Sequence, residues 1–158
     1  MLDQIDEKIL RELAGDGRMT NTALADRVGL SPSACLRRVQ ELERRGVIAG
    51  YRAVLNPKAL GIGVIAFVTV GLSNHSTQTQ AAFERAMAVA AQVTECHNIT
   101  GAVEYLLRVE ATDLDAYKHF HLEVLGAQPN VISIVTHIVL DTSKDLRGLP
   151  KAPAAGQS

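Results

Sequence analysis

Four arginines lie close together between residues 31 and 47: Arg37, Arg38, Arg44 and Arg45. A guanidinium group donates paired hydrogen bonds to the edge of guanine and also binds phosphate oxygens. At about 100° per residue, a helix over this segment gathers its polar and basic side chains on the face opposite its apolar residues. We therefore predict a helix that contacts double-stranded DNA through one set of residues: Ser31, Ser33, Ala34, Arg37, Arg38, Glu41 and Arg44.

The same face also fits an ordinary solvated helix, because Arg37 and Glu41 at i,i+4 form an ion pair on any such surface. The flanking residues favour DNA contact. Thr20 caps a first short helix, Gly29 ends it, and Ser31 followed by Pro32 starts the second helix. Helix, glycine turn and helix in this order are the helix-turn-helix signature.

An apolar stripe is expected to pack the second helix against its neighbours, and consists of Cys35, Leu36, Val39 and Leu42. A further amphipathic helix is predicted from Asp3 to Ala14. After Gly46, residues 49–57 read AGYRAVLNP, which predicts a strand or wing that ends at Pro57. Residues 1–57 are therefore predicted to form a winged helix-turn-helix domain.

Residues 58–63 contain two glycines and are interpreted as a hinge. The apolar run 62–72 predicts a buried strand, and later segments predict helix 77–90, strands 93–100 and 105–111, a helix capped by Asp113, and strand 131–141. This order is typical of the ferredoxin-like βαββαβ domain, here over 64–147, with an antiparallel four-stranded sheet and two helices. The fold class is α+β, and residues 148–158 are expected to be a mobile tail.

Two helices cover only one face of a four-stranded sheet. The first and last predicted strands are apolar on both faces, so the second face also needs cover. We therefore expect a homodimer in which a second subunit's sheet supplies that cover.

Composition favours the first domain as the end that binds nucleic acid. The 158 residues carry a net charge of −1. Residues 1–60 hold ten Lys and Arg against eight Asp and Glu, whereas residues 61–158 hold six against nine. We found no signal peptide and no apolar run long enough to span a membrane, and therefore expect a cytoplasmic protein without a membrane partner.

Catalytic and metal-binding patterns were sought without success. Cys35 and Cys96 stand alone, and His119 and His121 are two apart in a helix, so each pair is poorly spaced to hold a metal. No glycine-rich phosphate loop, nucleophile elbow or zinc-protease motif is present. We predict neither an enzyme nor a metal site.

The chain resembles the Lrp/AsnC family of feast/famine transcriptional regulators over residues 2–144. The similarity is strongest in LDQIDEKILRELAGDGR, VGLSPSACLRRVQELERRGVI, GYRAVLNP and ECHNITGAVEYLLRV. The resemblance implies dimerisation through the second domain, assembly into tetramers, octamers or discs, and binding of a small amino acid as effector, with no other cofactor. By the same similarity, the effector pocket comprises Gly101, Ala102, Val103, Glu104, Tyr105, Ser133 and Thr136.

The sequence departs from the family pattern at this pocket. Many members of the leucine-responsive type carry Gly-Asp-aromatic-Asp, whereas this chain has Gly101-Ala102-Val103-Glu104. The first carboxylate is absent, and Glu104 keeps the second with one more methylene. We hypothesise that Glu104 pairs with the effector's ammonium group. The alternative is that Glu104 is a solvated turn residue.

Two other functions stay open at this point. Relatives with the same two-domain layout include sirohaem decarboxylases, which use His and Arg around a tetrapyrrole, but no motif of that kind is found here. The other is an architectural DNA-binding protein whose second domain only assembles and binds no effector.

Overall fold

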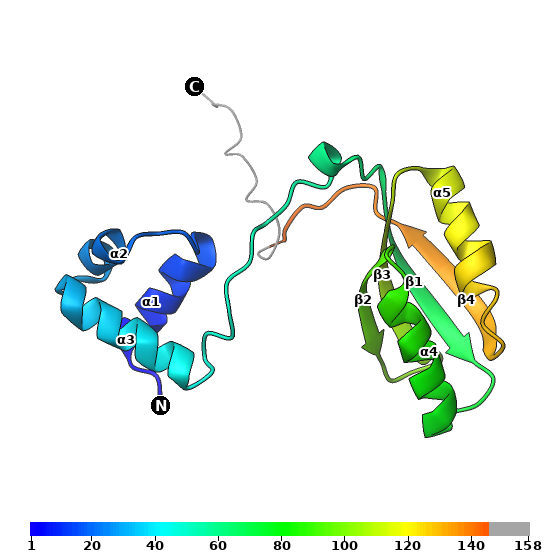
Figure 1. Cartoon of the computed structure of the whole chain (residues 1–158), viewed down its shortest axis with the longest axis horizontal. Helices are drawn as coiled ribbons and strands as arrows, with labels where there is room; N and C mark the ends of the chain where they lie inside the picture. Colours follow the sequence, from blue (N-terminus) through cyan, green and yellow to red (C-terminus); the bar gives the residue numbers. More distant parts are fainter. Residues whose placement is uncertain (146–158) are drawn as a thin grey trace. The chain divides into compact units, whose positions relative to one another are not determined.

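The computed structural model describes residues 1–145, which fall into two compact units (Figure 1). The first unit is Met1–Ala53, and the second begins at Val54. The predicted tail, 148–158, lies outside the described residues.

The first unit contains three helices: α1 (Gln4–Gly15), α2 (Asn21–Val28) and α3 (Pro32–Arg44). Each begins at a side chain that accepts hydrogen bonds from the otherwise unpaired N–H groups of the first turn. Asp3 forms a capping box with Asp6 in α1, while Thr20 caps α2 and Ser31 caps α3. The predicted helix-turn-helix is confirmed, including the positive φ of Gly29 at 75°.

The core of this unit gathers residues from all three helices: Ile9, Leu24, Ala25, Val28, Cys35 and Leu42. Val39 packs against this cluster, as the predicted apolar stripe required. The placement of Leu36 in that stripe was wrong, because its side chain is 46% exposed. The buried side of α3 is narrower than the sequence pattern indicated, since Cys35, Val39 and Leu42 suffice to contact the other helices.

The strand predicted within residues 49–57 is not formed in this chain, where residues 49–56 are irregular. A single segment with no neighbouring strand has no partner for the backbone hydrogen bonds of a sheet, so it does not form a β-strand. The Tyr51 hydroxyl instead donates to Glu43 Oε1 at 2.8 Å. The segment predicted as a hinge contains a short 3-10 turn, η1 (Lys58–Leu60).

The second unit follows the predicted order. It comprises β1 (Val64–Leu72), α4 (Thr77–Val89), β2 (Val93–Asn98), β3 (Tyr105–Ala111), α5 (Leu114–His119), the π-helical turn η2 (Phe120–Leu125) and β4 (Val131–Ile138). The strands lie in the order β2-β3-β1-β4, and every neighbouring pair is antiparallel. The ferredoxin-like α+β fold is confirmed.

Both helices cover the same face of the sheet (Figure 1). Phe83 and Met87 of α4, and Tyr117, Phe120 and Leu125 of α5 and η2, pack on alternate residues of β1 and β3. Within the second unit, no element covers the opposite face among the described residues. Phe67 is 38% exposed there and Val135 is 49% exposed.

Candidate DNA-binding surface and effector site

Arg37 is the predicted DNA contact with the most freedom to bind a new partner. It is exposed on α3, and within residues 1–145 it forms no hydrogen bond or ion pair. Ser33 is also exposed, and its hydroxyl lies 3.3 Å from the Ser31 hydroxyl, which caps the helix. Ala34 is half-buried beside them. The exposed face of α3 therefore presents a free guanidinium group next to small residues, which leaves room for close approach.

Arg44 and Glu41 lie on the same face but bind each other. The Nε and Nη2 atoms of Arg44 donate to the two Glu41 carboxylate oxygens at 2.8 and 2.6 Å. These bonds lower the pKa of Glu41 and raise that of Arg44. The ion pair between Arg37 and Glu41, which the alternative of an ordinary solvated helix would form, is not present, because Glu41 binds Arg44 instead.

Arg38 contacts α1 instead of projecting freely. Its Nη1 atom lies 2.6 Å from Asp3 Oδ2 and 2.8 Å from Asp6 Oδ1. The pKa of Asp3 is lowered, first by the hydrogen bond from the Asp6 backbone N–H and then by Arg38. Because Asp6 is buried, this contact holds α3 against the start of α1. The sequence pattern predicted Arg38 as a DNA contact and did not reveal these carboxylate partners.

The turn between α2 and α3 is also held in place. Asn21 Nδ2 donates to the Pro32 carbonyl oxygen at 2.8 Å, which joins the start of α2 to the start of α3. Arg27 of α2 pairs with Glu12 of α1 at 2.8 Å. These contacts give the exposed face of α3 a defined orientation within its unit.

Glu104 of the predicted effector site lies immediately before β3, and its side chain is only 12% exposed. Its Oε2 atom accepts the Leu72 backbone N–H at 2.5 Å. Its Oε1 atom lies 3.1 Å from His75 Nδ1. A carboxylate that is held by one backbone donor and faces an exposed imidazole keeps one oxygen for a cationic partner.

A glycine allows one more predicted residue, Ser133, to lie beside Glu104. Gly71 pairs with Ser133 across the β1 to β4 ladder, next to an irregularity in register. A Cβ atom on Gly71 would lie only 2.3 Å from Ser133 Oγ and 3.8 Å from Glu104 Oε2. Gly71 therefore permits a small polar site formed by Ser133 and Glu104. Gly101 has a φ of 127°, which favours glycine, and with Ala102 and Val103 it forms the adjoining turn.

Tyr105 and Thr136 lie on the helix-covered face of the sheet, so the single chain does not bring these two predicted residues together with Glu104. Successive side chains of a strand point to opposite faces. Tyr105 is fully buried and donates to Glu84 Oε1 at 2.8 Å, and burial first and this bond second raise its pKa to about 12. The Thr136 hydroxyl is hydrogen-bonded to Tyr117. The sheet thus separates these two residues from Glu104 and Ser133.

His75 and Gly71 were not predicted as neighbours of Glu104. The only signals were a histidine in the polar stretch after β1 and a glycine near the end of an apolar strand. Neither indicates contact with a residue some thirty positions later.

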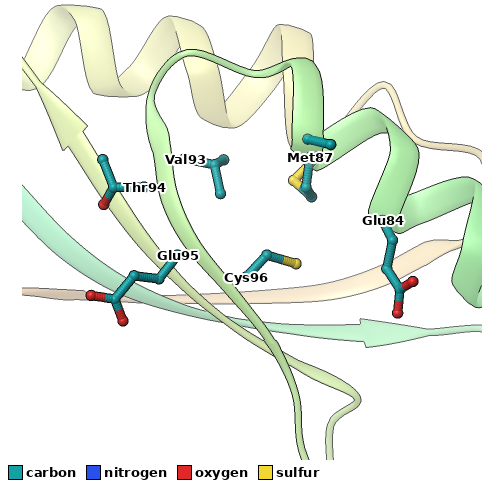
Figure 2. A pocket seen from close by; sticks show the side chains of 7 residues that line it. Glu84, Met87, Val93, Thr94, Glu95 and Cys96 are labelled. Carbon is teal, nitrogen blue, oxygen red and sulfur yellow. The ribbon is translucent and has the colours of Figure 1, made fainter. Parts of the chain in front are cut away.

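A separate hollow of about 390 Å³ lies between α4 and β2 (Figure 2). Figure 2 shows the Cys96 side chain directed toward α4, whereas Thr94 and Glu95 point away from that helix. Burial first, and Glu84 second, raise the pKa of the Cys96 thiol. A thiol kept protonated is a poor nucleophile.

Residues 1–145 contain no cluster of three metal-ligating side chains. In the same range, no helix is long and apolar enough to cross a membrane.

A helix-turn-helix unit with an exposed arginine, joined to a ferredoxin-like unit with a small polar site, defines a two-domain regulator that binds DNA and a ligand. Residues 2–49 match the winged helix-turn-helix DNA-binding model, and residues 65–149 match the Lrp/AsnC ligand binding domain. The chain belongs to the Lrp/AsnC family of transcriptional regulators.

Relatives and solved structures agree with this assignment. The leucine-responsive regulatory protein of Rhizobium meliloti is 45% identical over 91% of this chain and 92% of its own length. The Escherichia coli K12 protein of the same name is 40% identical over 90% of this chain and 87% of its own length. A transcriptional regulator from Neisseria meningitidis in complex with L-Met has a TM-score of 0.89 and 36% identity, covering 95% of this chain and 97% of that one. These relatives are regulators, which favours a non-enzymatic function.

Proposed function

We propose that this regulator senses a small amino acid through Glu104 and couples the binding event to its assembly on DNA. The observation that carries the proposal is the placement of Glu104, whose Oε2 atom is anchored by the Leu72 N–H while Oε1 faces the exposed His75. The effector's ammonium group would replace His75 at Oε1. The similar Neisseria protein binds L-Met, which makes an amino acid the first candidate.

The DNA-binding surface is proposed to be centred on Arg37 and Ser33, with Ala34 allowing close approach. Ser31 supports the site as the N-cap of α3, and Arg38 supports it by holding α3 against α1. Glu41 and Arg44 are proposed to lie at the rim, where a phosphate competes with Glu41 for the guanidinium group.

The oligomer is proposed to be built from homodimers that bury the open face of the sheet. Phe67 and Val135 supply its exposed apolar area. Dimers would associate further into tetramers or octamers, as the family resemblance implies. Paired recognition helices suit two half-sites about one DNA turn apart. Such a regulator acts in the cytoplasm, where the DNA is.

The test is titration calorimetry of the full chain with L-leucine, L-methionine and the remaining amino acids, combined with light scattering of the eluted oligomer. We expect at least one amino acid to bind and to change the oligomer size. Glu104→Gln should abolish that binding, whereas Glu123→Gln, an exposed carboxylate on η2, should leave it intact. Unchanged binding by Glu104→Gln would remove the role of Glu104. A fixed oligomer without binding would favour the architectural alternative.

A further inference from the structure

Leu36 is an apolar side chain on the exposed part of the recognition helix. It is 46% exposed, although its neighbour Cys35 is fully buried. It is not among the residues packed in the core of the first unit. A leucine in this position therefore contributes little to holding α3 in place.

On the solvent side of α3 the neighbours of Leu36 are polar and exposed, whereas Val39 on its other side packs against the core. Ser33 lies three residues before it and Gln40 four residues after it, and both spacings place side chains side by side on a helix. Arg37, with its free guanidinium group, is the next residue. Leu36 thus adjoins the part of α3 that we propose enters the DNA groove.

The opposite flank of α3 is unsuited to close approach by DNA. Arg38 lies there, about 160° around the helix from Leu36, and it is held by the Asp3 and Asp6 carboxylates. Two carboxylates repel phosphates, whereas Glu43, the acidic residue of α3 on the flank of Leu36, lies two turns further along and accepts a hydrogen bond from the Tyr51 hydroxyl. The flank that carries Leu36 and Gln40 is therefore the one open to the bases.

A single leucine among polar residues does not make a protein-binding patch, because such interfaces bury a contiguous apolar centre. It does match one apolar feature of the major groove, the 5-methyl group of thymine, which distinguishes thymine from the other bases. We infer that Leu36 contacts the 5-methyl group of a thymine next to the base that Arg37 binds, and so determines sequence specificity. This inference rests on the proposed role of α3 at the DNA.

The experiment uses the full chain and an operator selected from a random duplex library. Each thymine of that operator is replaced in turn by deoxyuracil, which lacks only the methyl group. For the wild-type protein we expect one thymine in each half-site whose replacement weakens binding about fourfold, the effect of burying one methyl group. Leu36→Ala and Leu36→Ser should bind the thymine and deoxyuracil operators equally well. The matched control Val89→Ala, an exposed residue of α4, should keep the fourfold difference.

Two outcomes would overturn the inference. One is an operator in which no thymine methyl matters to the wild-type protein. The other is a methyl effect that persists unchanged in both Leu36 variants. Far-UV circular dichroism of the variants verifies that they fold. A protein that selects no DNA sequence would defeat the proposed role of α3 as well, whereas selection without methyl coupling defeats only the role of Leu36.

Discussion

Arg37 differs from its neighbours in that the fold gives it no partner within residues 1–145. Arg38 and Arg44, by contrast, bind carboxylates of their own unit. Replacing Arg37 with alanine should weaken operator binding by about 1 to 3 kcal/mol if it contacts a base. Fluorescence anisotropy with specific and random duplexes, at several salt concentrations, measures this loss.

The pattern of the loss identifies the kind of contact that Arg37 makes. Relaxed specificity indicates a base, and uniform weakening with a shallower salt dependence indicates a phosphate. Arg85→Ala, which removes an exposed arginine of α4, is the matched control. An affinity that does not change in Arg37→Ala would contradict the proposed surface.

The buried hydroxyl of Tyr105 leads us to predict that the free energy of unfolding depends on pH in the alkaline range. Its folded pKa of about 12 lies above the ordinary value of 10.0, because burial first and the bond to Glu84 second oppose ionisation. The unfolded state therefore releases its proton first, and stability falls as pH rises from about 10 to about 12. Tyr105→Phe should lose about 1 kcal/mol of unfolding free energy at neutral pH, because its hydrogen bond to Glu84 is absent. Its stability should, however, fall less than that of the wild type as pH rises from about 10 to about 12. Urea denaturation at pH 7 to 12 compares the two slopes, and equal slopes would refute this cause.

At the scale of elements, the contact between α1 and α3 depends on Asp6. Its carboxylate accepts hydrogen bonds from Arg38 and from the Asp3 backbone N–H. Asp6→Ala should destabilise the protein by about 1 kcal/mol, a modest value because Arg38 is partly exposed to solvent. It should also weaken operator binding, since α3 loses a support and Arg38 loses a partner. Urea denaturation and anisotropy measure the two effects.

Glu7→Ala is the control for Asp6, because it removes an exposed carboxylate from the same turn of α1. We expect it to leave stability nearly unchanged. If Asp6→Ala and Glu7→Ala behaved alike, the contact between Arg38 and Asp6 would have no structural role.

At the scale of the whole molecule, the open face of the sheet is the proposed dimer interface. Phe67 projects from the central strand β1 and is partly exposed, with Val135 of β4 nearby on the same face. Phe67→Asp would bury an unpaired charge in the proposed dimer interface. We expect light scattering to show a monomer for this variant. Leu122→Asp, an exposed apolar residue on the helix side, should remain dimeric; a Phe67→Asp protein of unchanged size would place the interface elsewhere.

The helices, their starts and the order of elements were predictable from sequence because their signals are local. Asp3, Thr20 and Ser31 each cap a helix through bonds to residues at most three positions away. Gly29 ends α2 for an equally local reason, its positive φ. The family motifs then indicated the two domains and their functions.

The tertiary structure alone decided which side chains meet. Periodicity orients a side chain relative to its own element, but it does not say which element lies opposite. Glu104 reaches the Leu72 N–H because β3 pairs with β1, a contact between residues 32 positions apart. The same pairing turns Tyr105 to the opposite face, although it adjoins Glu104 in sequence. Arg38 likewise meets Asp6 only because α1 and α3 pack together, whereas Arg37 and Leu36 of the same helix stay exposed.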